Sequence, residues 1–312
     1  MTADLSDFIQ LTDDAAGTFL GVESARAAAS RGRAAKQIAS DVLALEPGRL
    51  LDLHEVSATQ KKALDLLFSR FPRLISLTEG YLPGTDAVMA IVKFRLGSDI
   101  AANNLSLANR YCSELVNEVR APRLRRFIRE TLTDGGELRV LGEEQLIEFL
   151  TGPYEQFAKA ASAGLVSRAG SLNEGLVREA LKSEQVKALR TGTEGNADVQ
   201  IAAPDLNPPQ VLNVEIKSYG ARERLLRGLQ DCNTPKIGVG FFNKASEFNA
   251  NRTSQLLGTN ASAIYLPETT YQALDAATRQ RQNAQGGVFY RPLNRLGSDM
   301  REFCRSGVRA FR

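Results

Sequence analysis

Two neighbouring stretches decide how this chain is expected to fold: residues 195–201, which read GNADVQI, and residues 211–218, which read VLNVEIKS. The segment between them contains PDLNPP at residues 204–209, a composition typical of a tight turn. The two stretches are therefore predicted to be the strands of a β-hairpin. Because alternate side chains of a strand point to the same face, Glu215 and Lys217 are expected to emerge together on the second strand.

An aspartate on the first strand, Asp198, completes a cluster that can carry chemistry. If the register of the hairpin places Asp198 beside Glu215, two carboxylates and the ammonium of Lys217 converge at one edge of the sheet. Carboxylate oxygens, with the backbone carbonyl of Ile216 as a further donor, are ligands for a hard cation such as Mg²⁺. A bound Mg²⁺ polarises a phosphodiester and lowers the pKa of a bound water. The lysine can orient that water, help to deprotonate it, or stabilise charge on the phosphate.

The tripeptide Glu215-Ile216-Lys217 is the one acidic-x-Lys sequence in the chain, and composition alone predicts about one such occurrence. Its significance therefore depends on context, since it ends an apolar strand that follows an aspartate-bearing strand across a turn. The alternative is a cross-strand ion pair on the sheet surface with no catalytic role.

The rest of the chain supplies the elements around this hairpin. From about residue 170, helices alternate with short apolar strands, which indicates a mixed sheet with helices packed on it. We expect strands at 197–201, 211–217, 236–242, 262–266 and 287–290. We expect helices at 172–189, 222–230, 268–279 and 297–305.

Residues 1–150 are expected to form a mostly helical region that serves recognition or dimerisation. Ser57 and Gln60 fit a capping box at a helix start. Apolar residues that include Cys112 recur at helical spacing over 98–119, and Pro122 suits the first turn of a following helix. In that following helix an apolar stripe alternates with arginines that either contact phosphates or form a solvated face. A strand is expected over 138–141, and helices over 143–150 and 153–168. The second region, 151–312, holds the hairpin.

The order helix, Asp strand, Glu-x-Lys strand, helix, strand resembles the PD-(D/E)xK nuclease superfamily, which includes many restriction endonucleases. The resemblance covers roughly residues 170–245 and is carried by Asp198, Glu215 and Lys217, with Ala197 where the motif has a proline. It implies a restriction endonuclease-like α/β fold, in which a mixed central sheet is flanked by helices, and Mg²⁺ as the cofactor.

Members of this family commonly carry a further acid on the preceding helix. Glu174 and Glu179 are the candidates here, at opposite margins of an apolar arc. Glu179 is preferred, because a glycine four residues before it resembles the usual helix of the family. The resemblance thus assigns catalysis to Asp198, Glu215, Lys217 and Glu179, and metal binding to Asp198, Glu215 and Ile216.

Composition excludes several other classes of enzyme. His54 is the single histidine, so zinc sites built on two or three imidazoles and nucleases that need paired histidines are ruled out. The three cysteines are isolated, which suits a reducing compartment and a cytoplasmic location. The N-terminal sequence shows no signal-peptide pattern, and no apolar stretch is long enough to span a membrane.

Charge is distributed unevenly along the chain. Residues 220–312 hold 14 Lys and Arg against 7 Asp and Glu, although the whole chain has a net charge of only +3. A basic region of this kind suits a nucleic acid. Candidate DNA contacts are phosphate-binding arginines directly after the Glu-x-Lys strand and base-reading side chains in a later polar segment. These residues are Arg222, Arg224 and Arg227, then Asn249, Asn251 and Arg252.

The sequence therefore leads to a Mg²⁺-dependent endonuclease of the type II restriction class, acting on double-stranded DNA as a homodimer. Two alternatives stay open. One is a repair, phage-defence or toxin nuclease that acts on branched DNA or RNA. The other is a nucleic-acid-binding module without catalytic activity, in which Glu215 and Lys217 form only an ion pair.

Overall fold

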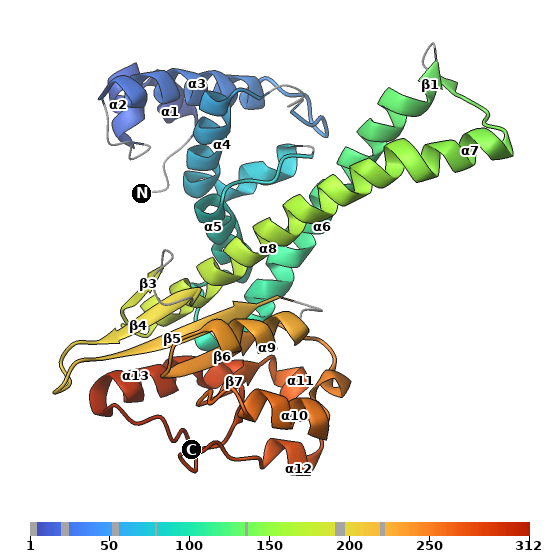
Figure 1. Cartoon of the computed structure of the whole chain (residues 1–312). Coiled ribbons are helices and arrows are strands. Elements are labelled where there is room, and N and C mark those ends of the chain that lie inside the picture. The colour runs from blue at the N-terminus through green and yellow to red at the C-terminus, as the bar shows by residue number, and fades with distance from the viewer. Residues whose placement is uncertain are drawn as a thin grey trace. The chain divides into compact units, whose positions relative to one another are not determined.

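The fold is that of a computed structural model, which describes residues 5–19, 25–51, 56–78, 80–134, 137–190, 197–218 and 222–312. The chain divides into two compact units (Figure 1). The helical unit comprises Met1–Gly97 and Tyr111–Leu165, and the sheet unit comprises Ser98–Arg110 and Val166–Arg312. His54 lies outside the described residues. No helix within the described ranges is both long and apolar enough to cross a membrane.

Helices dominate the helical unit, as expected for the N-terminal region. They are α1 (Leu5–Gln10), α2 (Asp13–Phe19), α3 (Ala25–Leu43), α4 (Ala58–Arg70), α5 (Thr85–Leu96), α6 (Leu105–Leu132), α7 (Glu143–Phe149) and α8 (Glu155–Ser183), and α6 and α8 continue into the sheet unit. The capping box at the start of α4 is confirmed, since the Gln60 N–H donates to Ser57 Oγ at 3.2 Å and the Ser57 N–H donates to Gln60 Oε1 at 2.9 Å. Cys112 is buried in the apolar stripe of α6, as predicted.

Pro122 does not start a new helix, because α6 runs through it without a break. Proline removes one backbone hydrogen bond from a helix interior. The helix nevertheless continues, since apolar residues recur at helical spacing on both sides of the proline, from Leu115 and Val119 to Leu124 and Phe127. Beyond Leu132 the chain forms a two-stranded hairpin, β1 (Thr133–Asp134) and β2 (Glu137–Leu138), where a strand over 138–141 was expected.

A six-stranded mixed sheet forms the centre of the sheet unit, which confirms the expected α/β class. Its strands are β3 (Ala188–Arg190), β4 (Val199–Ala203), β5 (Gln210–Lys217), β6 (Lys236–Gly240), β7 (Ile264–Leu266) and β8 (Tyr290–Pro292), and they lie side by side in sequence order. The first three strands are antiparallel, and β5 to β8 are parallel. The helices between and after these strands are α9 (Arg222–Asp231), α10 (Ala250–Leu257), α11 (Glu268–Gln272), α12 (Ala276–Arg279) and α13 (Leu296–Ser306).

The helices predicted over 153–168 and 172–189 are one continuous helix, α8. It ends early, at Ser183, and the last residues of the second predicted helix belong to the edge strand β3. Gln185 has a φ of +60°, the Gln185 N–H donates to the Lys182 carbonyl, and the Val186 N–H donates to the Leu181 carbonyl. This is a Schellman ending, which usually places glycine at the left-handed position. Because glutamine occupies it here, the sequence gives no stop signal.

Two further boundaries differ from expectation near the C-terminus. The strand expected at 287–290 is displaced to Tyr290–Pro292, because Val288 and Phe289 donate to the carbonyls of Phe311 and Arg281 instead of extending the parallel ladder. The single helix expected over 268–279 is the two short helices α11 and α12.

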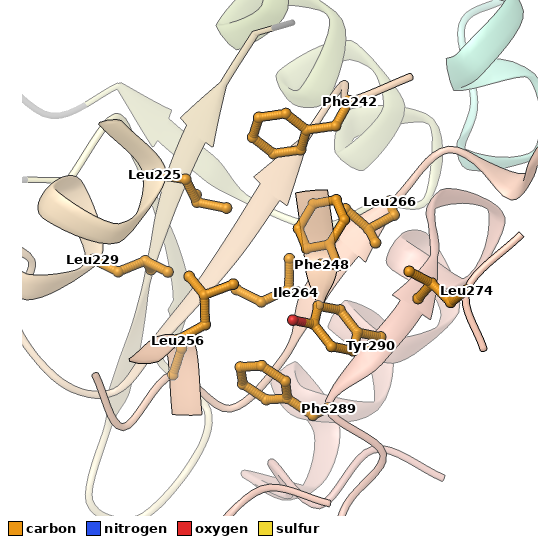
Figure 2. Close-up of a cluster of buried hydrophobic side chains, with 11 residues drawn as sticks. Leu225, Leu229, Phe242, Phe248, Leu256, Ile264, Leu266, Leu274, Phe289 and Tyr290 are labelled. Atoms are coloured by element: carbon orange, nitrogen blue, oxygen red, sulfur yellow. The ribbon is translucent and has the colours of Figure 1, made fainter. Parts of the chain in front are cut away.

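One face of the sheet is covered by the helices that connect its parallel strands. Leu225 and Leu229 of α9, Leu256 of α10 and Ile264 of β7 are fully buried in one apolar cluster (Figure 2). Gly238 lies beside Ile264 in the register, and a Cβ there would approach Ile264, Leu225 and Leu229. The glycine on β6 therefore lets α9 pack closely on the sheet.

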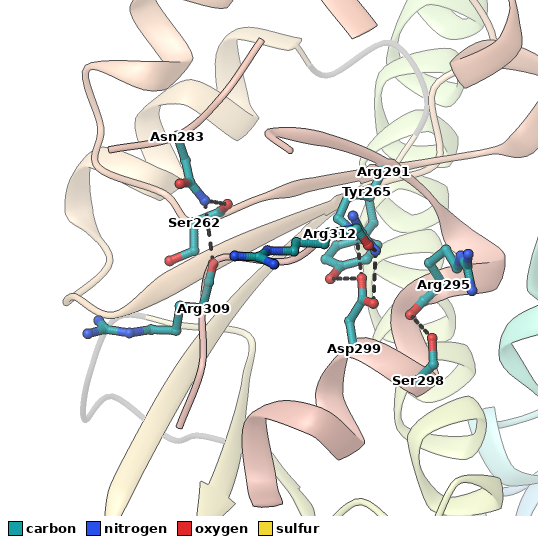
Figure 3. A network of polar contacts seen from close by, with 9 residues as sticks. All are labelled: Ser262, Tyr265, Asn283, Arg291, Arg295, Ser298, Asp299, Arg309 and Arg312. Atoms are coloured by element: carbon teal, nitrogen blue, oxygen red, sulfur yellow. Dashed lines mark hydrogen bonds and ion pairs between the residues drawn. The ribbon is translucent and has the colours of Figure 1, made fainter. Parts of the chain in front are cut away.

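The opposite face holds a buried polar network (Figure 3). Tyr265 Oη donates to Asp299 Oδ2 at 2.8 Å, and Arg291 Nη2 donates to Asp299 Oδ1 and to the Arg312 carbonyl, both at 2.9 Å. Burial, then the Asp299 carboxylate, raise the pKa of Tyr265 well above its ordinary value. The network joins β7, β8, α13 and the C-terminal segment.

We expect Asp299→Ala to lower the free energy of unfolding by about 3–5 kcal/mol, because it leaves the buried Arg291 guanidinium without its carboxylate. The matched control is Glu302→Ala on the same helix, where Glu302 pairs with Arg305 and both side chains are exposed. That exposed pair should contribute no more than about 1 kcal/mol. Denaturant unfolding of both variants measures the difference, and equal losses would contradict it.

Candidate functional site

The site begins where β4 begins, at the junction of the antiparallel and parallel parts of the sheet. The Asp198 N–H donates to the Val214 carbonyl at 3.1 Å, and Asp198 Oδ2 accepts from the Ile216 N–H at 2.7 Å. The carboxylate thus occupies the place of a backbone acceptor and ends the β4–β5 ladder. Because the N–H and C=O of one strand residue point to the same side, the Ile216 carbonyl also faces the side of Asp198.

Lys217 joins the two carboxylates that the sequence predicted. Its Nζ lies 3.2 Å from Asp198 Oδ2 and also contacts Glu215 Oε1. The Glu215 side chain is only 5% exposed, whereas those of Lys217 and Asp198 are 19% and 25% exposed. The structure therefore brings Asp198, Glu215 and Lys217 together, with Glu215 at the bottom of the cluster.

One glycine makes room for this cluster. In the parallel β5–β6 register Glu215 lies beside Gly238 and Lys217 beside Gly240, but a Cβ at these two glycines would meet Ile264 and Phe242 and not the cluster. Gly228 of α9 lies against Glu215, and an added Cβ at this glycine would overlap the Glu215 carboxylate. The sequence reasoning singled out none of these glycines, although Gly238 and Gly240 stand in the apolar run of β6.

The ionisation of the cluster reflects its burial. Burial is the largest effect on Glu215 and, with the charge of Asp198, raises the pKa of its carboxyl to about 7, against the lowering effect of the Lys217 hydrogen bond and charge. For Lys217, burial alone would lower the pKa, but the hydrogen bonds and charges of Glu215 and Asp198 outweigh it and raise the pKa above the ordinary value. Near neutral pH the ammonium is therefore retained, and Glu215 is close to half-protonated.

A polar anchor that sequence reasoning missed holds the end of α9 against the sheet. The buried Lys236 ammonium donates to the carbonyls of Leu229 and Cys232, the latter at 2.8 Å. A cation at a helix C-terminus satisfies carbonyls that have no partner within the helix. Asn213 donates to the Asn233 carbonyl at 2.9 Å and ties the following turn to β5. The one available signal was a lysine at the start of an apolar strand.

The helix acids are placed at the margins that the sequence predicted. On α8 the expected apolar arc is fully buried, including Leu176 and Val177, and both Glu174 and Glu179 are half-buried beside it. These two glutamates stay candidates, with Glu179 preferred on the resemblance alone.

The candidate DNA contacts lie on α9 and around the start of α10. Arg224 and Arg227 are exposed on α9, and Arg222 begins this helix but its side chain lies outside the described residues. Asn249 caps α10, because its Oδ1 accepts from the Arg252 N–H at 3.0 Å. The Arg252 guanidinium lies 3.3 Å from Glu223 of α9. Asn251 is exposed in the first turn of α10.

The oxygen ligands that the cluster offers are of the kind that binds a hard cation, but they are too few to complete its coordination. Among the described residues, no three His, Cys, Asp or Glu side chains gather into a metal-binding group. The cluster offers the carboxylates of Asp198 and Glu215 and the carbonyl of Ile216, all oxygen donors of the kind that Mg²⁺ prefers. Water or phosphate oxygens would have to complete the coordination, as is common for Mg²⁺.

We expect Gly228→Ala to destabilise the protein by about 1–3 kcal/mol, because the new methyl group displaces the buried Glu215 carboxylate. The matched control is Gly170→Ala in α8, where a Cβ meets nothing and helix propensity should add up to about 1 kcal/mol of stability. In a Glu215→Ala background the cost of Gly228→Ala should largely disappear. An unchanged cost in that background would refute the contact. Denaturant unfolding measures the wild type and all four variants.

The raised pKa of Glu215 predicts how stability depends on pH without added metal. Since the pKa is about 7 in the folded protein against an ordinary value of 4.5, the folded state keeps a proton that the unfolded chain releases. The contribution of Glu215 to the free energy of unfolding is fully present below pH 4.5 and is lost as pH rises through 7. Relative to Glu215→Gln, the wild type should lose roughly 3 kcal/mol between pH 4.5 and 8 in denaturant unfolding with a chelator. A constant difference between the two proteins would contradict this.

Comparison with known proteins finds no relative of this chain. No family model matches the sequence, and neither a curated protein nor a solved structure matches the chain. The geometry of the cluster formed by Asp198, Glu215 and Lys217 is therefore the main indication of function.

Proposed function

We propose that the protein is a Mg²⁺-dependent endonuclease that hydrolyses phosphodiester bonds of double-stranded DNA, of the type II restriction kind. The observation that carries this proposal is the convergence of Asp198, Glu215 and Lys217 from two adjacent strands. The order of α8, β4, β5, α9 and β6 also agrees with the order of elements in the PD-(D/E)xK nucleases that the sequence resembles.

Each residue of the cluster has a distinct role in this proposal. Asp198, Glu215 and the Ile216 carbonyl would hold Mg²⁺, which when bound activates a water molecule and polarises the scissile phosphate. The raised pKa of Lys217 keeps its ammonium charged at neutral pH. A charged Lys217 can donate hydrogen bonds to the water or to a phosphate oxygen.

The surroundings of the cluster suit a polyanionic substrate. Arg224 and Arg227 are exposed on α9, the helix that follows the Glu-x-Lys strand, and can contact phosphates beside the reacting one. Asn251 is exposed and suited to base contacts, whereas the side-chain oxygen Oδ1 of Asn249 already caps α10.

One observation favours a second candidate, a nucleic-acid-binding module without catalysis. The Lys217 ammonium already contacts both carboxylates, and Asp198 Oδ2 also accepts the Ile216 N–H. In that case the cluster serves only to end the β4–β5 ladder with its charges compensated. Such a module would bind nucleic acid in a salt-sensitive way without a metal requirement.

The deciding experiment is plasmid cleavage with Mg²⁺, with and without a chelator, by wild type, Asp198→Asn, Glu215→Gln and Lys217→Met. Each variant should lose at least about 100-fold in rate, while Glu302→Gln, an exposed control, keeps wild-type activity. At limiting Mg²⁺ the wild-type rate should rise with pH through about 7, because Glu215 must lose its proton to bind a cation.

The products distinguish the remaining readings. Discrete fragments from defined DNA support a restriction enzyme, whereas structure-dependent cutting or cleavage of RNA supports the repair or toxin alternative. Equal cutting by the wild type and the three site variants removes the cluster from the mechanism. Salt-sensitive binding with no cleavage in any metal supports the non-catalytic module.

A further inference from the structure

The helical unit contains an arm that does not form a core of its own. We define the arm as residues 120–159, which comprise the end of α6, the β1–β2 hairpin, α7 and the start of α8 (Figure 1). Among its described side chains, none is buried. The Phe127 ring stacks with those of Phe149 and Phe157, at centroid distances of 5.8 and 4.3 Å, so the helices of the arm do pack on each other.

The outer surface of α7 and of Leu150, the residue that follows it, exposes large apolar side chains. Leu146, Ile147 and Leu150 are 45%, 53% and 45% exposed. Their spacing of one and three residues places them along one side of the helix. Large apolar side chains gathered in this way mark an interaction surface more often than a plain solvent-facing one.

The two outer surfaces of the arm carry opposite charge. On α6 the exposed arginines at 123, 125, 126 and 129 lie outside the stripe formed by Leu124, Phe127 and Ile128. Arg123 donates to the Gly80 carbonyl and Arg126 pairs with Glu130. Arg125 and Arg129 are the arginines on which the docking surface depends. On α7 the charged residues are Glu143, Glu144 and Glu148, with no basic residue. One side of the arm is therefore basic, and the other is acidic and apolar.

We propose that the arm is the self-association surface of the protein, with α7 of one copy docked on the arginine-bearing surface of α6 in a second copy. A two-fold axis forms this contact twice, so that each arm gives its acidic helix and receives the partner's acidic helix. The carboxylates of α7 face guanidinium groups, and Ile147 and Leu150 pack on the apolar stems of the arginine side chains. The same docking removes the exposed apolar side chains of α7 from water.

A nucleic acid fits the arm less well than a second copy does. The arginines of α6 alone suit phosphates. The neighbouring α7 presents three glutamates and two exposed apolar side chains, followed directly by exposed Leu150, and these do not suit phosphates. A second copy uses both surfaces at once.

The test is sedimentation equilibrium of the full chain without DNA or metal, so that its outcome does not depend on nuclease activity. We expect a dimer for the wild type. Arg125→Glu/Arg129→Glu should weaken it by roughly 100-fold or more through like charges, and so should Glu144→Arg/Glu148→Arg. Lys61→Glu/Lys62→Glu on α4, with exposed lysines and the same change in charge, should leave the dimer intact.

Mixing the two charge-reversed proteins provides the sharpest result. One has two acidic surfaces and the other two basic surfaces, so a mixed dimer has complementary charge at both contacts and should form, although neither protein dimerises alone. A monomeric wild type would overturn the proposal, and so would a dimer that both reversals leave intact. Loss of DNA binding by the arginine reversal, with the dimer unchanged, would overturn it in favour of a nucleic-acid surface.

Discussion

The arrangement of the sheet unit around β5 depends on how the Glu215 carboxyl is accommodated in an almost fully buried position. Burying an ionised carboxylate costs much free energy unless a cation pairs with it, and burying a protonated carboxyl costs less. Both pairing and protonation lower this cost here, because Lys217 contacts Glu215 directly and burial raises the pKa of Glu215 to about 7. The requirement extends to the backbone, since a Cβ at position 228 of α9 would overlap the Glu215 carboxylate, and glycine leaves that space open.

The same requirement explains how α9 is fixed. Leu225 and Leu229 anchor one side of this helix in the apolar cluster over the parallel strands, while Gly228 faces Glu215. Lys236 holds the C-terminal end of the helix by donating to the carbonyls of Leu229, in its last turn, and of Cys232, the residue after it. One helix thus covers both the apolar core and the charged cluster, so that a shift of α9 would disturb packing and ionisation together.

The sequence was sufficient for the hairpin and the cluster but not for their supports. The two strand-like stretches and the proline-rich turn between them predicted β4 and β5, and the i, i+2 spacing placed Glu215 and Lys217 on one face. Local patterns of this kind carry their own geometry. The end of α8 at Ser183 depends on Gln185 in an uncommon left-handed conformation. The edge strand β3 and the continuation of α6 through Pro122 depend on long-range packing. The contact between Gly228 and Glu215 joins residues that no local pattern relates.

The ionisation of the cluster also bears on what it can do. Asp198 and Glu215 already bind one cation, the Lys217 ammonium, and near pH 7 Glu215 binds a proton for part of the time. For these carboxylates to hold Mg²⁺, they must release that proton and share or exchange the ammonium. A pair of carboxylates that only ends a strand ladder does not need to release its proton or its ammonium. Competition among proton, ammonium and metal at Asp198 and Glu215 is therefore the physical property that separates a catalytic cluster from a structural one.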